Sequence, residues 1–252
     1  MTSDIKIFSP SYRRSNNCVI HKYLSQVNYV VAESEKSKYK DVHEKIIAIP
    51  DNEQGSYPKV CNWILRNGGD KIVIIDDDMK SINRWTKRVS KKLNEKQVYD
   101  FLVKGFLIAK EIGVHYWGMN INKDKQLYRE YIPFSLTSYL GGPFQAFYKN
   151  DLLFDERMLL KEDYDMTLQQ LNKYRKVFRF NMFYFDCKQA EQEGGCATYR
   201  NFDTEMDQLK LLQKKWGSDI VRIDKADRSH NLKKKKSKID FNPIIKAPIK
   251  GI

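Results

Sequence analysis

The stretch KIVIIDDDMK, residues 71–80, decides the fold, because an unbroken apolar run ends there in three carboxylates. All four residues from Ile72 to Ile75 are β-branched, which predicts a strand buried on both faces, as in a parallel sheet. Asp76, Asp77 and Asp78 then fall at the carboxyl end of this strand, and open α/β sheets place their ligands at that edge.

The three adjacent carboxylates predict a cation site. Like charges side by side disfavour one another unless a positive group lies among them, and a divalent cation supplies one. Asp76 and Asp78 point the same way along an extended chain. A solvated acidic turn is the simpler alternative. A Ca²⁺ loop of the EF-hand kind is not predicted, since its Gly and late Glu are not in place.

The residues before this stretch alternate between strand and helix patterns, which predicts a parallel sheet with crossover helices. A helix that starts near Pro58 and stops at Gly68–Gly69 leads into the aspartates. The other expected elements are strands at 5–9, 29–33 and 46–50, a helix at 15–27 and a polar helix at 34–45.

The later part of the chain carries one strongly patterned helix. Asn94 and Gln97 form a capping pair, and the apolar residues from Val98 to Ile112 recur every three or four positions, which predicts a core-facing stripe. The basic segment 85–92 predicts a hairpin or a mobile loop. Further strands are expected at 114–121, 131–136, 141–149 and 177–186, and a last helix at 206–216.

The C-terminal residues differ in composition from the rest. From Lys225 onward the chain contains a lysine run at 233–236 and two prolines, which predicts an extended or partly disordered tail. We therefore expect one domain over residues 1–225 and a basic extension over residues 226–252.

Composition limits the classes of function. The chain has 252 residues and a net charge of +13, which favours polyanionic partners such as nucleic acid, anionic membrane surfaces or acidic glycans. It has no apolar run long enough to span a membrane and no visible secretory signal. The four cysteines are scattered without metal-site spacing, so a reducing cytoplasm is expected, in a host cell if the gene is phage-borne.

A second acidic group opens the helix expected within 159–171. Glu162, Asp163 and Asp165 crowd its start, although acids there are favoured by the helix dipole in any case. The loop 191–201 contains Gly194 and Gly195 and is expected to be mobile. A histidine, His230, follows the last core helix.

Together, the strand that ends in an Asp-x-Asp-like triplet, the acidic helix start and His230 give the chain a resemblance to GT-A glycosyltransferases. These enzymes use nucleotide sugars and have a Rossmann-like sheet. More narrowly, the chain resembles the TET-associated glycosyltransferases over residues 4–232. This phage-linked group is implicated in adding sugars to hydroxymethylated pyrimidines, such as 5-hydroxymethylcytosine, in DNA.

The resemblance implies roles for particular residues on the donor side. The loop after the first strand, with Ser9, Pro10, Tyr12 and Arg13, would hold the nucleotide base, and Glu33 would lie near the base and ribose. Asp78 would ligate the metal directly, Asp76 would lie nearer the ribose or the metal waters, and His230 would complete the coordination. Asp77 is an extra acid relative to a plain Asp-x-Asp, so the question of which two aspartates bind stays open. Arg200 could help to clamp the diphosphate.

On the acceptor side, the resemblance implies that Gly141–Gly142 forms the turn leading to the acceptor and that Asp163 or Asp165 is the catalytic base. Mn²⁺ or Mg²⁺ would neutralise the departing phosphate of a UDP-sugar, and a single base predicts inversion at the sugar carbon. The expected acceptor is modified double-stranded DNA. The alternatives are a polysaccharide, lipid or protein acceptor, or a nucleic-acid-binding module without catalysis.

Overall fold

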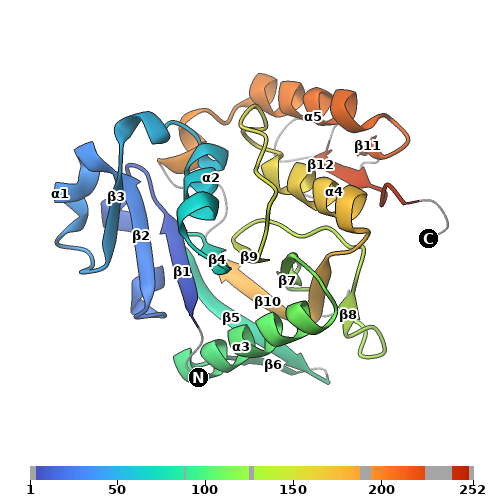
Figure 1. Ribbon diagram of the computed structural model, residues 1–252, viewed down its shortest axis with the longest axis horizontal. Coiled ribbons are helices and arrows are strands. Elements are labelled where there is room, and N and C mark those ends of the chain that lie inside the picture. The colour runs from blue at the N-terminus through green and yellow to red at the C-terminus, as the bar shows by residue number, and fades with distance from the viewer. Residues whose placement is uncertain (1–3, 88, 125–127, 188–193, 225–239, 250–252) are drawn as a thin grey trace.

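The computed structural model describes residues 4–87, 89–124, 128–187, 194–224 and 240–249, and its centre is one mixed sheet (Figure 1). The strand order is β3-β2-β1-β4-β9-β7-β10-β5-β6, and β8 pairs with β10 beside this path. The strands are β1 (Ile5–Pro10), β2 (Val27–Ala32), β3 (Ile46–Ile49), β4 (Lys71–Ile75), β5 (Met79–Thr86), β6 (Val89–Lys92), β7 (Tyr116–Asn120), β8 (Phe134–Ser135), β9 (Phe144–Tyr148) and β10 (Phe178–Cys187).

The first four strands form a parallel, Rossmann-like half with the order 3-2-1-4. The chain runs outward from β1 to β3 and then crosses back to β4 on the other side of β1. The direction of winding therefore changes between β1 and β4, and such a switch point leaves a crevice at the carboxyl ends of its two strands. The mostly parallel α/β architecture predicted from the sequence is confirmed.

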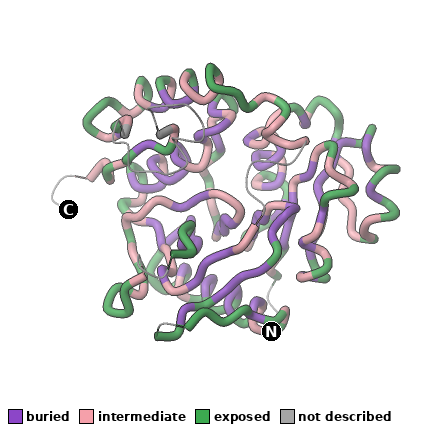
Figure 2. The backbone as a smooth tube through the Cα atoms, turned by 180° about the vertical axis from the view of Figure 1, so that it is seen from behind, coloured by how far each residue is buried: buried purple, intermediate pink, exposed green. Residues whose placement is uncertain are grey.

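Strand β4 is buried on both faces, as its sequence predicts. Val73 and Ile75 join one hydrophobic cluster with α3 (Glu95–Glu111) and the short α1 (Lys36–Tyr39). Ile72 and Ile74 join a second cluster with α2 (Tyr57–Asn67) and α4 (Glu162–Tyr174). Helices therefore cover both faces of the sheet, and long stretches of the central strands between them are buried (Figure 2).

The helix predicted over residues 15–27 is wrong. Two short 3-10 turns, Ser15–Asn17 and Ile20–Lys22, replace it. The backbone N–H groups of Val19 and Ile20 donate to the carbonyl oxygen of Asp77, at 2.8 and 3.2 Å, so tertiary bonds replace helical ones. The polar helix predicted at 34–45 is also reduced, to a 3-10 turn at Glu33–Glu35 and the four residues of α1.

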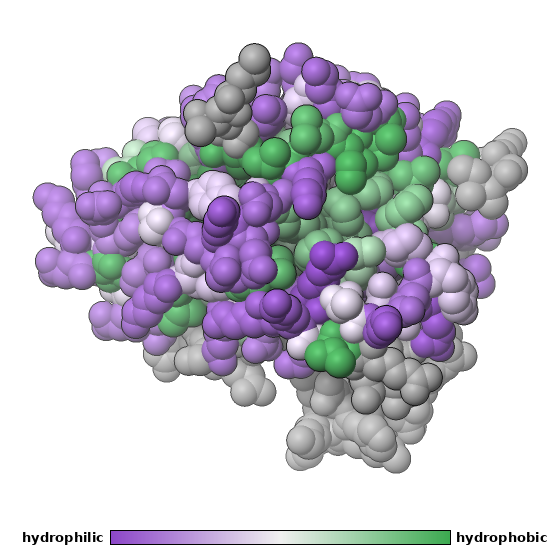
Figure 3. All heavy atoms as spheres, turned by 90° about the horizontal axis from the view of Figure 1, so that it is seen from below, coloured by the Kyte–Doolittle hydropathy of each residue, from purple (hydrophilic) through white to green (hydrophobic). Residues whose placement is uncertain are grey.

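Helix α3 confirms the strongest helical prediction. Asn94 and Gln97 form a capping box, and Val98, Phe101, Leu102 and Ala109 are buried against the sheet. Its outer side is not wholly polar, because the Leu107 side chain is 56% exposed. Viewed from below, the molecule shows a hydrophobic band bordered by hydrophilic residues (Figure 3).

The later part of the sheet is largely antiparallel. β5 and β6 form the hairpin expected at 85–92, and β10 lies between β5 and β7. Helix α5 (Phe202–Trp216) packs against α4 outside the sheet. Two further 3-10 turns precede helices in the chain: η5 (Gly195–Thr198) comes before α5, and η4 (Asp51–Glu53) comes before α2. No helix among the described residues is long and apolar enough to cross a membrane.

The predicted boundary between residues 225 and 226 falls between two strands that pair. β11 (Val221–Asp224) and β12 (Asp240–Ile245) form a separate antiparallel ribbon. Ile245 packs against the cluster shared by α4 and α5, and Ala247 and Ile249 pack against the cluster under α2. Residues 240–249 are therefore part of the folded body. His230 and the lysine run at 233–236 lie outside the described residues.

Candidate functional site

Three segments meet at the switch point between β1 and β4. They are the loop after β1, residues 11–14, the aspartate turn after β4, and residues 194–200, which dock onto that loop. The first two segments are placed there by the parallel pairing of β1 and β4, because the carboxyl ends of parallel strands share one edge. The start of α4 lies within electrostatic range of the same edge, as the pKa shifts described below indicate.

Asp77 fastens the loop after β1 to the aspartate turn. Its side chain is 2% exposed and accepts a hydrogen bond from Ser11 Oγ at 2.5 Å. Arg14 Nη1 contacts the other carboxylate oxygen at 3.3 Å. Burial raises the pKa of Asp77, while Arg14 and the hydrogen bond from Ser11 oppose that rise. Asp77 therefore holds the 11–14 loop in place through Ser11 and Arg14.

Asp76 and Asp78 lie on either side of Asp77 in a tight turn. The Met79 N–H closes the turn on the Asp76 carbonyl oxygen at 3.2 Å, so the chain here is folded back and not extended. Burial, then repulsion from Asp78 and from Asp77, raises the pKa of Asp76 to about 7. The Tyr57 hydroxyl is its side-chain hydrogen-bond partner, at 3.5 Å.

The end of β10 closes another side of this turn. Cys187 pairs with Met79 across β5 and β10. Burial first, and then the charges of Asp76 and Asp78, raises the pKa of the Cys187 thiol to about 12. The thiol therefore stays protonated near neutral pH and adds no further negative charge to the turn.

Asp163 is oriented by three donors at the start of α4. Its Oδ2 accepts a hydrogen bond from the Tyr139 hydroxyl and one from the Gly142 N–H at 3.0 Å, and its Oδ1 accepts one from the Tyr164 N–H at 2.8 Å. A Cβ atom on Gly141 would lie 2.4 Å from Asp163 Oδ2. The Gly141–Gly142 turn is thus built around this carboxylate, which remains partly exposed.

Glu162 is a half-buried residue with one buried carboxylate oxygen, Oε2. Its Oε2 has no hydrogen-bond partner among the described residues. Burial, then Asp163, raises the pKa of Glu162 well above its ordinary value. Burial also raises the pKa of Tyr57, and the charges of Asp76 and Glu162 add to that rise. The charges of Glu162, on α4, and of Asp76, in the aspartate turn, therefore both act on Tyr57.

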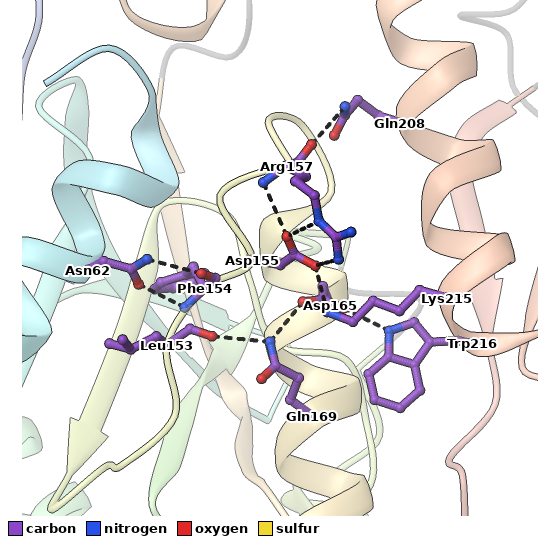
Figure 4. Close-up of polar contacts among 10 residues, drawn as sticks. All are labelled: Asn62, Leu153, Phe154, Asp155, Arg157, Asp165, Gln169, Gln208, Lys215 and Trp216. Carbon is purple, nitrogen blue, oxygen red and sulfur yellow. Dashed lines mark hydrogen bonds and ion pairs between the residues drawn. The ribbon is translucent and has the colours of Figure 1, made fainter.

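Asp165 has a different environment from its two neighbours on α4 (Figure 4). Its side chain is 0% exposed and accepts hydrogen bonds from Trp216 Nε1 at 2.8 Å, Lys215 Nζ at 2.9 Å and Gln169 Nε2 at 2.8 Å. Lys215 also contacts Asp155 at 2.9 Å. Asp165 thus joins α4 to the end of α5, and no surface is left on it for a substrate.

The described part of the 191–201 loop, which the sequence predicts to be mobile, is docked on the loop after β1. The Gly195 N–H donates to the Tyr12 carbonyl oxygen at 2.9 Å, and Arg14 Nη2 donates to the Gly194 carbonyl oxygen at 3.1 Å. A Cβ atom on Gly194 would lie 2.8 Å from the Tyr12 and Arg13 carbonyl oxygens. Arg200 follows, with its Nε 3.2 Å from Glu205, and its charge acts on Glu162.

The residues expected to hold the nucleotide base are only partly brought together. Ser9 is buried at the end of β1, and the Arg13 guanidinium lies over the Tyr12 ring at 5.0 Å. Glu33 is exposed and pairs with Lys36 at 3.6 Å. Of the two acids in the turn after β2, Glu35 contacts this loop and Glu33 does not: Glu35 is buried and accepts a hydrogen bond from the Arg13 N–H at 3.0 Å.

Sequence reasoning missed two residues that shape the site, Tyr57 and Tyr139. The sequence carries no signal for either, since each reaches its carboxylate from a distant part of the chain. Arg14 and Glu162 were recognisable, because Arg14 stands in the basic loop after the first strand and Glu162 stands in the acidic helix start. Within the described ranges no three His, Cys, Asp or Glu side chains form a metal cluster, and His230 lies outside those ranges.

A Rossmann-like half-sheet with a switch point between β1 and β4 defines the class of open α/β proteins, which place ligands at this edge. A match to a family model identifies the chain more specifically than its fold does. The family model for TET-associated glycosyltransferases matches residues 5–195, and the chain belongs to that family. It is therefore a glycosyltransferase, and the alternative of a binding module without catalysis is set aside.

Two further comparisons add little. No curated protein matches the chain. A solved structure of CMP:2-keto-3-deoxy-manno-octonic acid synthetase complexed with CTP aligns with 84% of this chain and 100% of its own, at 11% identity and a TM-score of 0.41. That similarity is too low to carry an argument about function.

Proposed function

We propose that this glycosyltransferase transfers a sugar from a UDP-linked donor to a hydroxymethylated pyrimidine in double-stranded DNA. The observation that carries the proposal is the convergence of the 11–14 loop, the aspartate turn and the acidic start of α4. This convergence supports a donor diphosphate at the β1–β4 edge and an acceptor near α4. The unpaired cysteines at positions 18, 61, 187 and 196 fit action in a reducing cytoplasm.

The aspartate turn fits a divalent cation. Carboxylate oxygens are the ligands preferred by Mg²⁺, and Mn²⁺ accepts them as well. The raised pKa of Asp76 reflects burial first and then the charges of Asp78 and Asp77, and a cation between Asp76 and Asp78 would offset those charges. His230 would supply a third ligand. When bound, the cation neutralises the negative charge that builds on the departing diphosphate.

On the donor side, the protein's own residues hold the nucleotide. Tyr12 and Arg13 offer a ring and a cation to the base, while Asp77 fixes their loop through Ser11 and Arg14. Arg200 offers a guanidinium to the diphosphate. The segment 194–201, already docked on the loop, would exclude water from the donor and so limit hydrolysis.

Asp163 is the base in this proposal. Three donors fix its orientation, and its carboxylate is partly exposed, whereas Asp165 is buried and fully engaged. Asp163 would accept the proton of the acceptor hydroxyl as that oxygen attacks the sugar carbon. One base opposite the leaving group gives inversion at that carbon.

The DNA acceptor is supported by the family and by the net charge of +13. The first test measures UDP release from a panel of UDP-sugars with Mn²⁺, with Mg²⁺ and with EDTA. We expect metal-dependent release, and Asp78→Ala should abolish turnover without changing the circular dichroism spectrum. Full activity in EDTA or in Asp78→Ala would overturn the metal assignment. Metal-dependent release with no transfer to DNA would point to a polysaccharide, lipid or protein acceptor.

A further inference from the structure

A cavity of about 500 Å³ lies beside Tyr139 and the start of α4. Its walls come from three parts of the chain: the segments around β7 and β8, the start of α4 with β10, and the end of the β12 ribbon. The lining includes Arg179, Lys246, Thr137 and Ser138 and contains no carboxylate. The cavity is therefore positively charged.

Arg179 is held in place by hydrogen bonds and pairs with no carboxylate among the residues that the structure describes. Its Nε donates to Asn181 Oδ1 at 2.8 Å, and its Nη1 donates to the Tyr139 carbonyl oxygen at 3.3 Å. None of the ion pairs between described residues includes Arg179. Burial lowers the pKa of its guanidinium, with no carboxylate opposing that shift. A partly buried cation without a counterion is suited to an anionic ligand.

The cavity is coupled to the proposed base through Tyr139. This residue lines the cavity, and its hydroxyl donates to Asp163 Oδ2. The Tyr139 and Tyr164 rings stack at 4.0 Å and form one wall. A ligand in the cavity would thus lie beside Tyr139, which is hydrogen-bonded to Asp163.

The neighbouring surface favours a polynucleotide as the source of the anion. Arg179 pairs with Ser135 of β8, and the chain just before β8 exposes Tyr131 at 79% and Ile132 at 47%. Phe134 in β8 is 53% exposed. Exposed rings beside fixed cations are the pattern by which proteins hold nucleic-acid strands.

We infer that this cavity binds a backbone phosphate of the DNA acceptor, held by Arg179 and Lys246. This inference rests on the proposed function, because it assumes that the acceptor is DNA. The phosphate contact would position the strand so that the modified base reaches Asp163. Such contacts fix register and orientation and carry no sequence information.

The test compares Arg179→Gln with Arg66→Gln, which removes the same charge from the exposed surface of α2, where Arg66 makes only long ion pairs of 3.8 and 3.9 Å. For Arg179→Gln we expect at least about a 10-fold rise in the KM for modified duplex DNA and a salt slope of log Kd that is lower by about 0.9. The KM for the UDP-sugar and the melting temperature should stay unchanged. Lys246→Gln, on a separate wall, should give a smaller change of the same kind.

The possible outcomes separate the phosphate site from the proposed function. If the wild type binds and modifies DNA but Arg179→Gln behaves like Arg66→Gln, the phosphate site is refuted while the proposed function stands. If only the KM for the UDP-sugar rises, the cavity serves the donor phosphate and the inference fails. Inorganic phosphate is then added at millimolar concentration to both proteins. If phosphate competes with DNA for the wild type alone, and restores none of the DNA affinity that Arg179→Gln has lost, the site recognises phosphate as inferred. A wild type that neither binds nor modifies DNA removes the proposed function and this inference with it.

Discussion

At the residue scale, two acids on α4, Asp163 and Asp165, lie in opposite environments. Asp163 is partly exposed and oriented by Tyr139 and Gly142, whereas Asp165 is buried among Lys215, Trp216 and Gln169. The sequence shows only two aspartates two positions apart. Helical geometry turns such residues to different sides, but which side meets the substrate depends on where α5 packs.

This difference predicts that conservative changes at the two positions affect different properties. Asp163→Asn should lower kcat about 10²- to 10⁴-fold, because a general base is lost, while the melting temperature and donor binding stay near wild type. Asp165→Asn should reduce the unfolding free energy by about 2 kcal/mol, because Lys215 loses its buried partner, with kcat little changed. The measurements are single-turnover kinetics and thermal unfolding. The reverse pattern would assign the base to Asp165.

A second residue-scale prediction concerns pH. The pKa of Asp76 rises from 3.8 to about 7 on folding, so the folded state holds this proton more tightly than the unfolded chain does. The unfolding free energy of the metal-free protein should therefore fall as the pH rises through this interval. Mn²⁺ should then raise the melting temperature more at pH 8 than at pH 5.

The matched variants are Asp76→Asn and Asp70→Asn. Asp76→Asn should stabilise the metal-free protein at pH 8 and remove much of the stabilisation by Mn²⁺. The Asp70 side chain is 69% exposed, and its carboxylate lies 3.9 Å from Lys149 Nζ, so its replacement should leave both properties unchanged. Equal stabilisation by Mn²⁺ in wild type and Asp76→Asn would exclude Asp76 from the cation site.

At the element scale, the docking of residues 194–201 on the 11–14 loop offers a test with a built-in control. Gly194 and Gly217 both have a φ of 87°, so alanine is strained equally at either position. A Cβ atom at Gly194 would meet Arg14 Cγ at 2.7 Å, whereas nothing lies within 4 Å of one at Gly217. Gly194→Ala should raise the KM for the UDP-sugar and increase its hydrolysis relative to transfer.

Gly217→Ala should show only the loss of stability that alanine suffers at a positive φ, and its kinetics with the donor should be normal. Donor KM and the ratio of free sugar to transferred sugar are the quantities to compare. If the two variants are kinetically alike, the docked segment does not take part in donor binding.

Elements differ in how far the sequence predicts them. β4 and α3 were predictable because burial on both faces and a capped 3.6-residue stripe are local patterns. Residues 15–27 were not, since Val19 and Ile20 bond to Asp77, a partner far along the chain. The candidate site divides in the same way: the carboxylates lie in recognisable motifs, but Tyr57 and Tyr139 reach them only through tertiary folding.

At the scale of the whole molecule, the first half of the main sheet carries the aspartate turn at the end of β4, and the second half carries part of the cavity lining. β10 reaches the aspartate turn at Cys187 and the cavity at Arg179, so a single strand contributes to both places. The β11–β12 ribbon then covers one wall of the cavity. Residues 240–249, which looked like a tail by composition, complete this side of the fold.

The charge of the molecule gives a prediction at this scale. With a net charge of +13, binding to duplex DNA should weaken steeply as salt increases, because lysines and arginines displace condensed counterions. Log Kd plotted against log salt concentration should be linear with a slope of several units. A flat response in a fluorescence titration would be incompatible with DNA as the acceptor.

The most direct test of the central claim is mass spectrometry of nucleosides. Duplex DNA containing 5-hydroxymethylcytosine or 5-hydroxymethyluracil is incubated with the protein, Mn²⁺ and each UDP-sugar, then digested to nucleosides. We predict a hexose- or N-acetylhexosamine-sized mass gain on one modified nucleoside, absent with Asp78→Ala and strongly reduced with Asp163→Asn. Unmodified nucleosides with every donor, alongside metal-dependent release of UDP, would contradict the DNA acceptor and leave a glycosyltransferase with another substrate.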